Sequence, residues 1–189
     1  MANLGIDEYD AVVSSIYQSS LEVGDTPDAL QRIAALVGCT GASLIRIATS
    51  GEILEFHAYN HSSAAQSDYG AHYHRVDPGV QWIATAAVGE LGMDTAAFDA
   101  RNPAHREYVY DFCYRHNIRY VAGLKTLQTP DSLTLISLQR GAGMPAFREN
   151  GELLLNRIRP HLVRAALLQA QLGTATTRQG LAESALDKL

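Results

Sequence analysis

The sequence has little cysteine and no long apolar run. It contains two cysteines, Cys39 and Cys113, and no apolar stretch near the roughly 20 residues that span a bilayer. Its acidic first ten residues lack the basic region and the apolar region of a signal peptide. We therefore expect a cytoplasmic protein without a membrane segment, in which both cysteines act as small buried hydrophobes rather than as a disulfide pair.

Positive charge is also scarce, and it is scattered along the chain. Lys and Arg number 15 against 20 Asp and Glu, which gives a formal net charge of −5. Affinity for phosphate backbones depends mainly on clustered Lys and Arg. Only Arg157, Arg159 and Arg164 come close to a cluster, and a solvated helix face explains them. We expect no direct nucleic-acid binding by this chain.

Patterns that hold a metal or carry catalysis are absent as well. Among the seven histidines, His57 and His61 fall where a predicted strand gives way to a loop. His72 and His74 would point to different sides of a helix. No cysteine or carboxylate spacing completes a tetrahedral site, and the chain has neither a nucleophile elbow nor a phosphate-binding glycine loop. We expect no metal, no cofactor and no enzymatic activity.

What the sequence does contain is two strand-like regions bracketed by helical ones. Period-two alternation predicts two hairpins, at residues 42–59 and 119–140. In the first hairpin, Leu54, Phe56 and Ala58 are expected on one face. Helical periodicity covers residues 6–21, 26–37, 62–75, 79–88 and a segment that begins at Asn102, whereas residues 89–99 fit an edge strand or a loop. Because both hairpins can pair in one sheet, we predict an α+β fold with an antiparallel sheet of four to five strands flanked by helices.

A long amphipathic helix is predicted after the segment 145–150, and it continues to about Leu172. Apolar residues at steps of three and four along one side are typical of a pairing seam, and they are Leu155, Ile158, Leu162, Ala165 and Leu172. A second apolar row lies beside this seam and contains Leu154, His161 and Leu168, with Leu153 and Leu167 widening it. We predict that one flank of the helix closes the domain core. The other flank either pairs two copies as a homodimer, with the seam as the interface, or carries a signal out of the domain.

Three stretches resemble the N-terminal sensor region of LuxR-type transcriptional regulators, whose fold is similar to GAF and PAS domains. They are residues 69–78, residues 105–118, and residues 145–150 together with 159–162. The resemblance implies a GAF/PAS-like sensor domain over residues 1–172, with a dimerisation helix at 145–172. It also implies a helical linker at 173–189 that leads to a DNA-binding domain missing from this chain.

The Asp77-Pro78 pair resembles a stretch of the acyl-homoserine-lactone receptors, which are members of that group of regulators. The likeness implies that Asp77 hydrogen-bonds a ligand amide and that Tyr69 or Tyr73 is its aromatic partner. Those receptors carry a tryptophan four residues before the tyrosine, where this chain has Ala65. The single tryptophan, Trp82, follows the pair instead, so we do not predict a lactone ligand.

Large aromatic residues are spread over the elements that would enclose a space between the sheet and the helices. Because ligand pockets are mostly apolar with few polar groups, the candidate ligand-binding residues are Phe56, His57, Tyr69, Tyr73, Asp77, Trp82 and Phe112. Asp77 and His57 are the candidate polar anchors. The structural alternatives are that Asp77 only ends a helix before Pro78 and that the aromatics only fill a core.

Two functions therefore stay open. The first is a sensor domain of a transcriptional regulator that binds a small, largely apolar molecule and relays this through its final helix. The second is a ligand-free module for dimerisation or protein docking.

Overall fold

The computed structural model describes residues 6–93, 99–147 and 151–186, with side chains except those of Val23 and residues 176–186. Parts of four predictions therefore lie outside the described residues. They are positions 1–5 of the sensor domain, positions 94–98 of the segment that fitted a strand or a loop, positions 148–150 of the segment before the last helix, and positions 187–189 of the linker.

The core of the fold is one antiparallel sheet of five strands in the order β2-β1-β5-β4-β3. Its strands are β1 (Gly41–Ala48), β2 (Ile53–Tyr59), β3 (Leu91–Met93), β4 (Tyr120–Gln128) and β5 (Ser132–Arg140). The hairpins β1-β2 and β4-β5 join through the pairing of β1 with β5, and β3 forms the edge beside β4. The predicted α+β fold is confirmed, and the segment after residue 88 contributes an edge strand.

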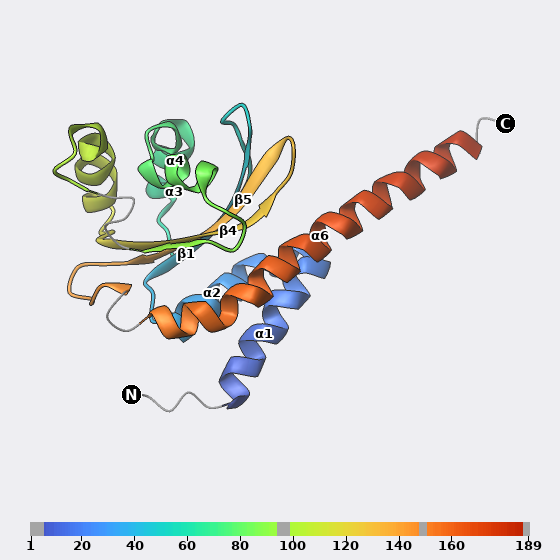
Figure 1. Cartoon of the computed structure of the whole chain (residues 1–189), viewed down its shortest axis with the longest axis horizontal. Helices are drawn as coiled ribbons and strands as arrows, with labels where there is room; N and C mark the ends of the chain where they lie inside the picture. The colour runs from blue at the N-terminus through green and yellow to red at the C-terminus, as the bar shows by residue number, and fades with distance from the viewer. Residues whose placement is uncertain (1–5, 94–98, 148–150, 187–189) are drawn as a thin grey trace.

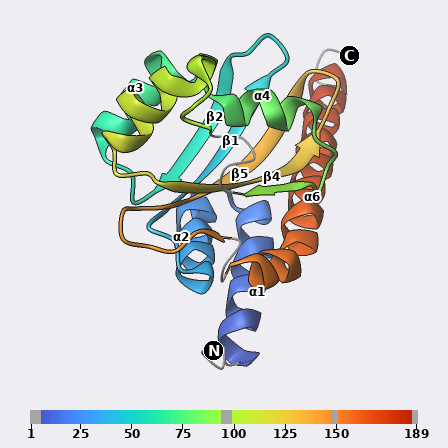
Figure 2. The ribbon, with the colours of Figure 1, turned by 60° about the vertical axis from the view of Figure 1, so that its left-hand side comes forward.

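Helices cover both faces of this sheet (Figure 1). One face carries α1 (Ile6–Leu21), α2 (Thr26–Val37) and the long α6 (Glu152–Leu186). The other face carries α3 (Ser63–Ala71), α4 (Pro78–Thr85) and the π-helix η5 (Tyr108–Tyr114), as Figure 2 also shows. Each layer of helices shares its own apolar cluster with the sheet.

Local chemistry sets the ends of α2 where the sequence placed them. Pro27 occupies the first turn, where its missing N–H costs no helical hydrogen bond. Gly38 ends the helix with φ of 68°, and its N–H returns to the carbonyls of the last turn. A residue with a Cβ would be strained at this position.

The predicted dimer seam faces into the chain's own core. Leu155, Ile158, Leu162 and Ala165 are buried within the cluster that joins α1, α2, α6 and the sheet, whereas Leu172 is 46% exposed. Four of the five seam residues therefore stabilise a single chain, and a second copy cannot reach them in this structure. The exposed apolar residues of α6 are Leu153, Leu167, Leu168 and Leu172.

Two local predictions need correction. Leu54 does not share a face with Phe56, because a bulge in the β1-β2 pairing inserts it as an extra residue between Ile53 and Glu55. The helix expected after Asn102 is a short 3₁₀ turn, Pro103–His105, followed by η5. Val109, Phe112 and Cys113 of η5 are nevertheless buried, whereas Tyr110 and Tyr114 are exposed.

Candidate functional site: a pocket between the sheet and α3, α4 and η5

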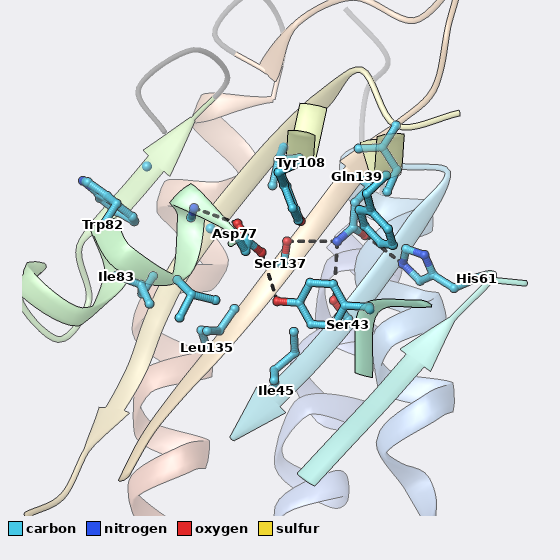
Figure 3. A pocket seen from close by; sticks show the side chains of 18 of the residues that line it. Ser43, Ile45, His61, Asp77, Trp82, Ile83, Tyr108, Leu135, Ser137 and Gln139 are labelled. Atoms are coloured by element: carbon cyan, nitrogen blue, oxygen red, sulfur yellow. Dashed lines mark hydrogen bonds between the residues drawn. The ribbon is translucent and has the colours of Figure 1, made fainter. Parts of the chain in front are cut away.

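A pocket lies between the sheet and the helices α3, α4 and η5 (Figure 3). Alternate residues of the central strands form its floor, namely Ser43 and Ile45 of β1 and Leu135, Ser137 and Gln139 of β5. This alternation follows from the pleat, which turns every second side chain to the same face. The walls come from the helices and from the edge strands β2 and β3.

Asp77 is the buried acidic residue of this pocket, with 7% of its surface exposed. Pro78 holds it in an extended conformation, so that it becomes the N-cap of α4. Its Oδ1 accepts the Gly79 N–H at 2.7 Å, and its Oδ2 accepts the Tyr69 hydroxyl at 2.9 Å. The helix-capping role and the pocket position therefore coincide in one carboxyl group.

The electrostatics around Asp77 favour a hydrogen-bond donor beside it. Burial raises the pKa of Asp77, and hydrogen bonds from Tyr108, Gly79, Tyr69 and the backbone of Val80 oppose that rise. Burial and the nearby carboxylate raise the pKa of Tyr69 and of Tyr108 well above the usual value, so both hydroxyls stay protonated and donate. A ligand N–H or O–H at this point would further stabilise the carboxylate.

A second polar group lies on the sheet floor, where side chains of β1 and β5 and His61 are joined by hydrogen bonds (Figure 3). The Gln139 Nε2 donates to Ser137 Oγ at 2.9 Å and to Ser43 Oγ at 3.4 Å. The Gln139 Oε1 lies 3.1 Å from His61 Nε2. Burial lowers the pKa of His61, so the ring is neutral at pH 7 and its Nε2–H donates to the Gln139 carbonyl. We call Ser43, His61, Ser137 and Gln139 the polar strip.

Aromatic rings form the apolar wall between these two polar places. Tyr69 stacks on Phe56 with 5.7 Å between ring centroids, and Phe112 lies 5.5 Å from Tyr69 and 5.3 Å from Tyr108. Offset and tilted rings at such distances attract each other beyond their buried area. The wall is therefore a connected aromatic cluster.

The space left at the centre of the pocket is about 60 Å³. Small-molecule sites usually measure roughly 300–1,000 Å³. Trp82 contributes to the difference, because its indole lies so close to β3 that a Cβ at Gly92 would be 2.7 Å from the ring. A ligand larger than a few atoms can enter only if side chains such as Trp82 move.

The structure brings five of the seven predicted ligand-binding residues to this pocket: Phe56, Tyr69, Asp77, Trp82 and Phe112. His57 does not belong there, because it points to the opposite face of the sheet, where its Nε2 lies 2.8 Å from Glu55 Oε1. Tyr73 packs behind the wall, with its ring 5.0 Å from Phe112, and does not line the pocket. Sequence reasoning missed Tyr108 and the polar strip, although the period-two alternation of β1 and β5 could have indicated Ser43, Ser137 and Gln139.

Other chemistry is sparse in the described ranges. Within them, no three His, Cys, Asp or Glu side chains converge as metal ligands, and no helix is long and apolar enough to cross a membrane. Both cysteines are free thiols. Burial raises the pKa of Cys39 to about 12 and that of Cys113 further, so both stay protonated at pH 7.

The five-stranded antiparallel sheet with helices on both faces is the fold of GAF-like domains. The ligand-binding domain of VqsR from Pseudomonas aeruginosa shares this fold with a TM-score of 0.67 at 12% identity, over 88% of this chain and 98% of that one. The lactone-dependent LuxR-family factor CepR2 from Burkholderia cenocepacia gives 0.60 at 11% identity, over 86% and 93%.

A GAF domain from an Acinetobacter phosphoenolpyruvate-protein phosphotransferase gives a TM-score of 0.55 at 14% identity, over 92% of this chain and 99% of that one. No protein-family model and no curated protein matches the sequence. The likeness confirms the predicted GAF-like fold of LuxR-type sensor regions.

Proposed function

We propose that this chain is the ligand-sensing domain of a transcriptional regulator, and that its pocket binds a small, largely apolar molecule. One observation carries the proposal. A buried carboxyl group, Asp77, sits in an aromatic pocket with two tyrosine hydroxyls and two backbone N–H groups directed at it. Filling a core does not require a carboxyl group there, because burying its charge is costly.

The two polar places of the pocket suggest how a ligand lies in it. A donor group of the ligand would face Asp77, its apolar body would lie along the aromatic wall, and a second polar group would reach the polar strip. Ala65 lines the pocket four residues before Tyr69, so the wall lacks the tryptophan of the lactone receptors. We therefore favour a ligand other than a lactone.

A solved complex offers a chemical starting point. The SdiA structure with octanoyl-rac-glycerol has a TM-score of 0.52 to this chain at 16% identity, and the match covers 88% of this chain and 60% of that one. Such a molecule is neutral, and it has hydroxyl donors at one end and an acyl chain at the other. These features agree with a site that offers one acceptor and an apolar wall.

Relay to α6 would run through the end of β5. Gln139 belongs to the polar strip, and its neighbour Arg140 points to the opposite face of the sheet. The Arg140 guanidinium donates to Val37 O at 2.7 Å and to Gly38 O at 3.0 Å, which closes the end of α2. It also donates to Pro145 O at 3.0 Å and to Ala146 O at 3.2 Å, just before α6. A ligand that moves Gln139 would favour one of two positions of α6, because the ligand would bind the chain more tightly when α6 is in that position.

The homodimer remains part of the proposal, with its interface moved to the outer side of α6. Leu167, Leu168 and Leu172 are each more than 40% exposed on this helix. A row of exposed leucines at helical spacing is typical of a surface that pairs with another helix. Of the seam predicted from sequence, only Leu172 belongs to this row.

The proposal is tested first by native mass spectrometry of the purified protein and by thermal shift across a metabolite panel that includes octanoyl-rac-glycerol. We expect a co-purified small molecule or a stabilising panel member, since a ligand that binds only the folded state raises the unfolding temperature. If no small molecule is retained and no panel member shifts the unfolding temperature, ligand sensing is contradicted.

The second candidate function is a ligand-free module for dimerisation or protein docking. The observation that favours it is the 60 Å³ of free space, which fits a nearly filled core. Under this reading a pocket-filling substitution raises stability and no small molecule has any effect. Under ligand sensing the same substitution removes the thermal shift that a ligand causes.

A further inference from the structure

A hollow roomier than the Asp77 pocket lies on the other face of the sheet. It is a groove of about 800 Å³ between the sheet, the helices α1 and α2 on one side and α6 on the other. Ile16, Leu30 and Leu162 line it, and Thr126 and Thr134 form part of its floor. Its size falls within the usual range of small-molecule sites, roughly 300–1,000 Å³.

Small side chains keep this groove open. Where α6 passes over the sheet it presents Ala166, Ala170 and Gly173, and the facing strands present Thr126 and Thr134. Protein interiors are close-packed, with few voids larger than a water molecule. Larger aliphatic residues at these positions would close the gap, so the small side chains leave open space that an apolar molecule can fill.

A free hydroxyl on the groove floor points to the nature of that occupant. Thr134 lines the groove, and its hydroxyl has no hydrogen-bond partner among the described residues. Its own carbonyl already accepts the hydroxyl of Thr126 at 3.2 Å. The Thr134 hydroxyl is open to the groove rather than buried without a partner, so a bound molecule with a hydrogen-bonding group would pair with it in place of water.

The charges at the rim argue for a neutral molecule. Arg46 already pairs with Glu55 at 3.2 Å, and the exposed Asp131 adds a further negative charge. A carboxylate ligand would meet this excess of negative charge, whereas a neutral head group would not. We propose that the groove is a second binding site, distinct from the Asp77 pocket, for a neutral amphiphile with an apolar body and a hydroxyl or amide head. Because α6 forms one of its walls, occupancy would act on this helix directly.

The probe for this site is decan-1-ol, measured by calorimetry on the whole chain. Trp82 is the only tryptophan and lines the pocket, not the groove. We expect saturable binding that leaves Trp82 emission unchanged, and weaker binding of decanoate. Ala170→Leu should abolish binding by filling the groove, whereas the matched Ala175→Leu, at an exposed position of α6 outside the groove, should not.

Thr134→Val separates binding from folding. It should weaken decan-1-ol binding by roughly three- to tenfold, the usual worth of one neutral hydrogen bond. It should leave the unfolding temperature nearly unchanged, because the hydroxyl that it removes bonds to no other described residue and is open to the groove. The proposal is overturned if decan-1-ol gives no heat, if Ala170→Leu leaves its binding intact, or if Trp82 emission reports that the probe sits in the pocket. It is equally overturned if Ala170→Leu turns a dimer into a monomer in sedimentation, since a second copy would then occupy the groove.

Discussion

The hydroxyl of Tyr69 donates to Asp77 Oδ2 at 2.9 Å, which links α3 to the first residue before α4. The two residues are eight positions apart, and both line the pocket. The same carboxyl group caps α4 through the Gly79 N–H. Any group that competes for this carboxyl therefore acts on two helices of the pocket wall. The protonation state of Asp77 should be visible in the pH dependence of the free energy of unfolding.

Asp77→Asn should change how stability depends on pH. Burial raises the pKa of Asp77 in the folded state, so the folded protein holds this proton more tightly than the unfolded chain. The stability contributed by this group is present below the ordinary aspartate pKa of about 3.9 and is lost as pH rises towards the folded pKa. In urea titrations, stability of the variant relative to the wild type should rise with pH across that window. A constant difference would show that the carboxyl group is not perturbed.

Tyr69→Phe should lower the free energy of unfolding by about 1–3 kcal/mol, because it removes a hydrogen bond to a buried carboxyl group. Tyr73→Phe is the matched control, since Tyr73 packs on the same Phe112 ring but lies outside the pocket lining. Chemical denaturation at pH 7 measures both. Equal effects of the two substitutions would count against the special position of the Tyr69 hydroxyl.

Arg140→Lys should be strongly destabilising although it keeps the charge. The guanidinium donates to four backbone carbonyls and lies 4.3 Å from the centre of the Phe147 ring. Lysine cannot reproduce this planar fork, so we expect a loss of about 3–5 kcal/mol, similar to breaking a buried charged network. Arg32→Lys, at an exposed pair with Asp28, should cost less than about 1 kcal/mol. If Arg140→Lys is equally mild, Arg140 does not hold the start of α6.

The two sides of α6 should respond differently to truncation. Leu162 is 5% exposed in the core, and Leu168 is 43% exposed. Leu162→Ala should cost about 2–5 kcal/mol in unfolding free energy. Leu168→Glu should leave folding within about 1 kcal/mol and should weaken self-association in sedimentation. Unchanged association of the Leu168→Glu protein would place the dimer interface elsewhere.

Much of the fold could be predicted from the sequence, because local signals agree with the tertiary structure. Pro27 and Gly38 mark the ends of α2, and the alternation in both hairpins predicted strands that do pair in one sheet. The bulge at Leu54 could not be predicted, because it follows from the register between β1 and β2 rather than from the residues of β2 alone.

The pocket was predicted in part for a similar reason. Asp77 and Tyr69 stood out because the Asp77-Pro78 pair and the tyrosine before it resemble the ligand-binding residues of the lactone receptors. Gln139 and Ser43 are 96 positions apart, and only the pairing of β1 with β5 brings them together. The seam on α6 failed as an interface, because apolar spacing alone does not distinguish a partner chain from the sheet of the same chain.

The most direct test of ligand sensing follows Trp82 emission while the panel molecule with the largest thermal shift is titrated into the wild type and into Gly123→Val. Gly123 lines the pocket, and a Cβ there would be in ordinary contact at 3.9 Å from Ile83 and from Trp82, so the position accepts a side chain and valine would take up pocket space. The account predicts a saturable change with one molecule per chain in the wild type, and at least about tenfold weaker binding in the variant, as expected for a blocked apolar site. No saturable change in the wild type, or equal affinity in both proteins, would contradict it.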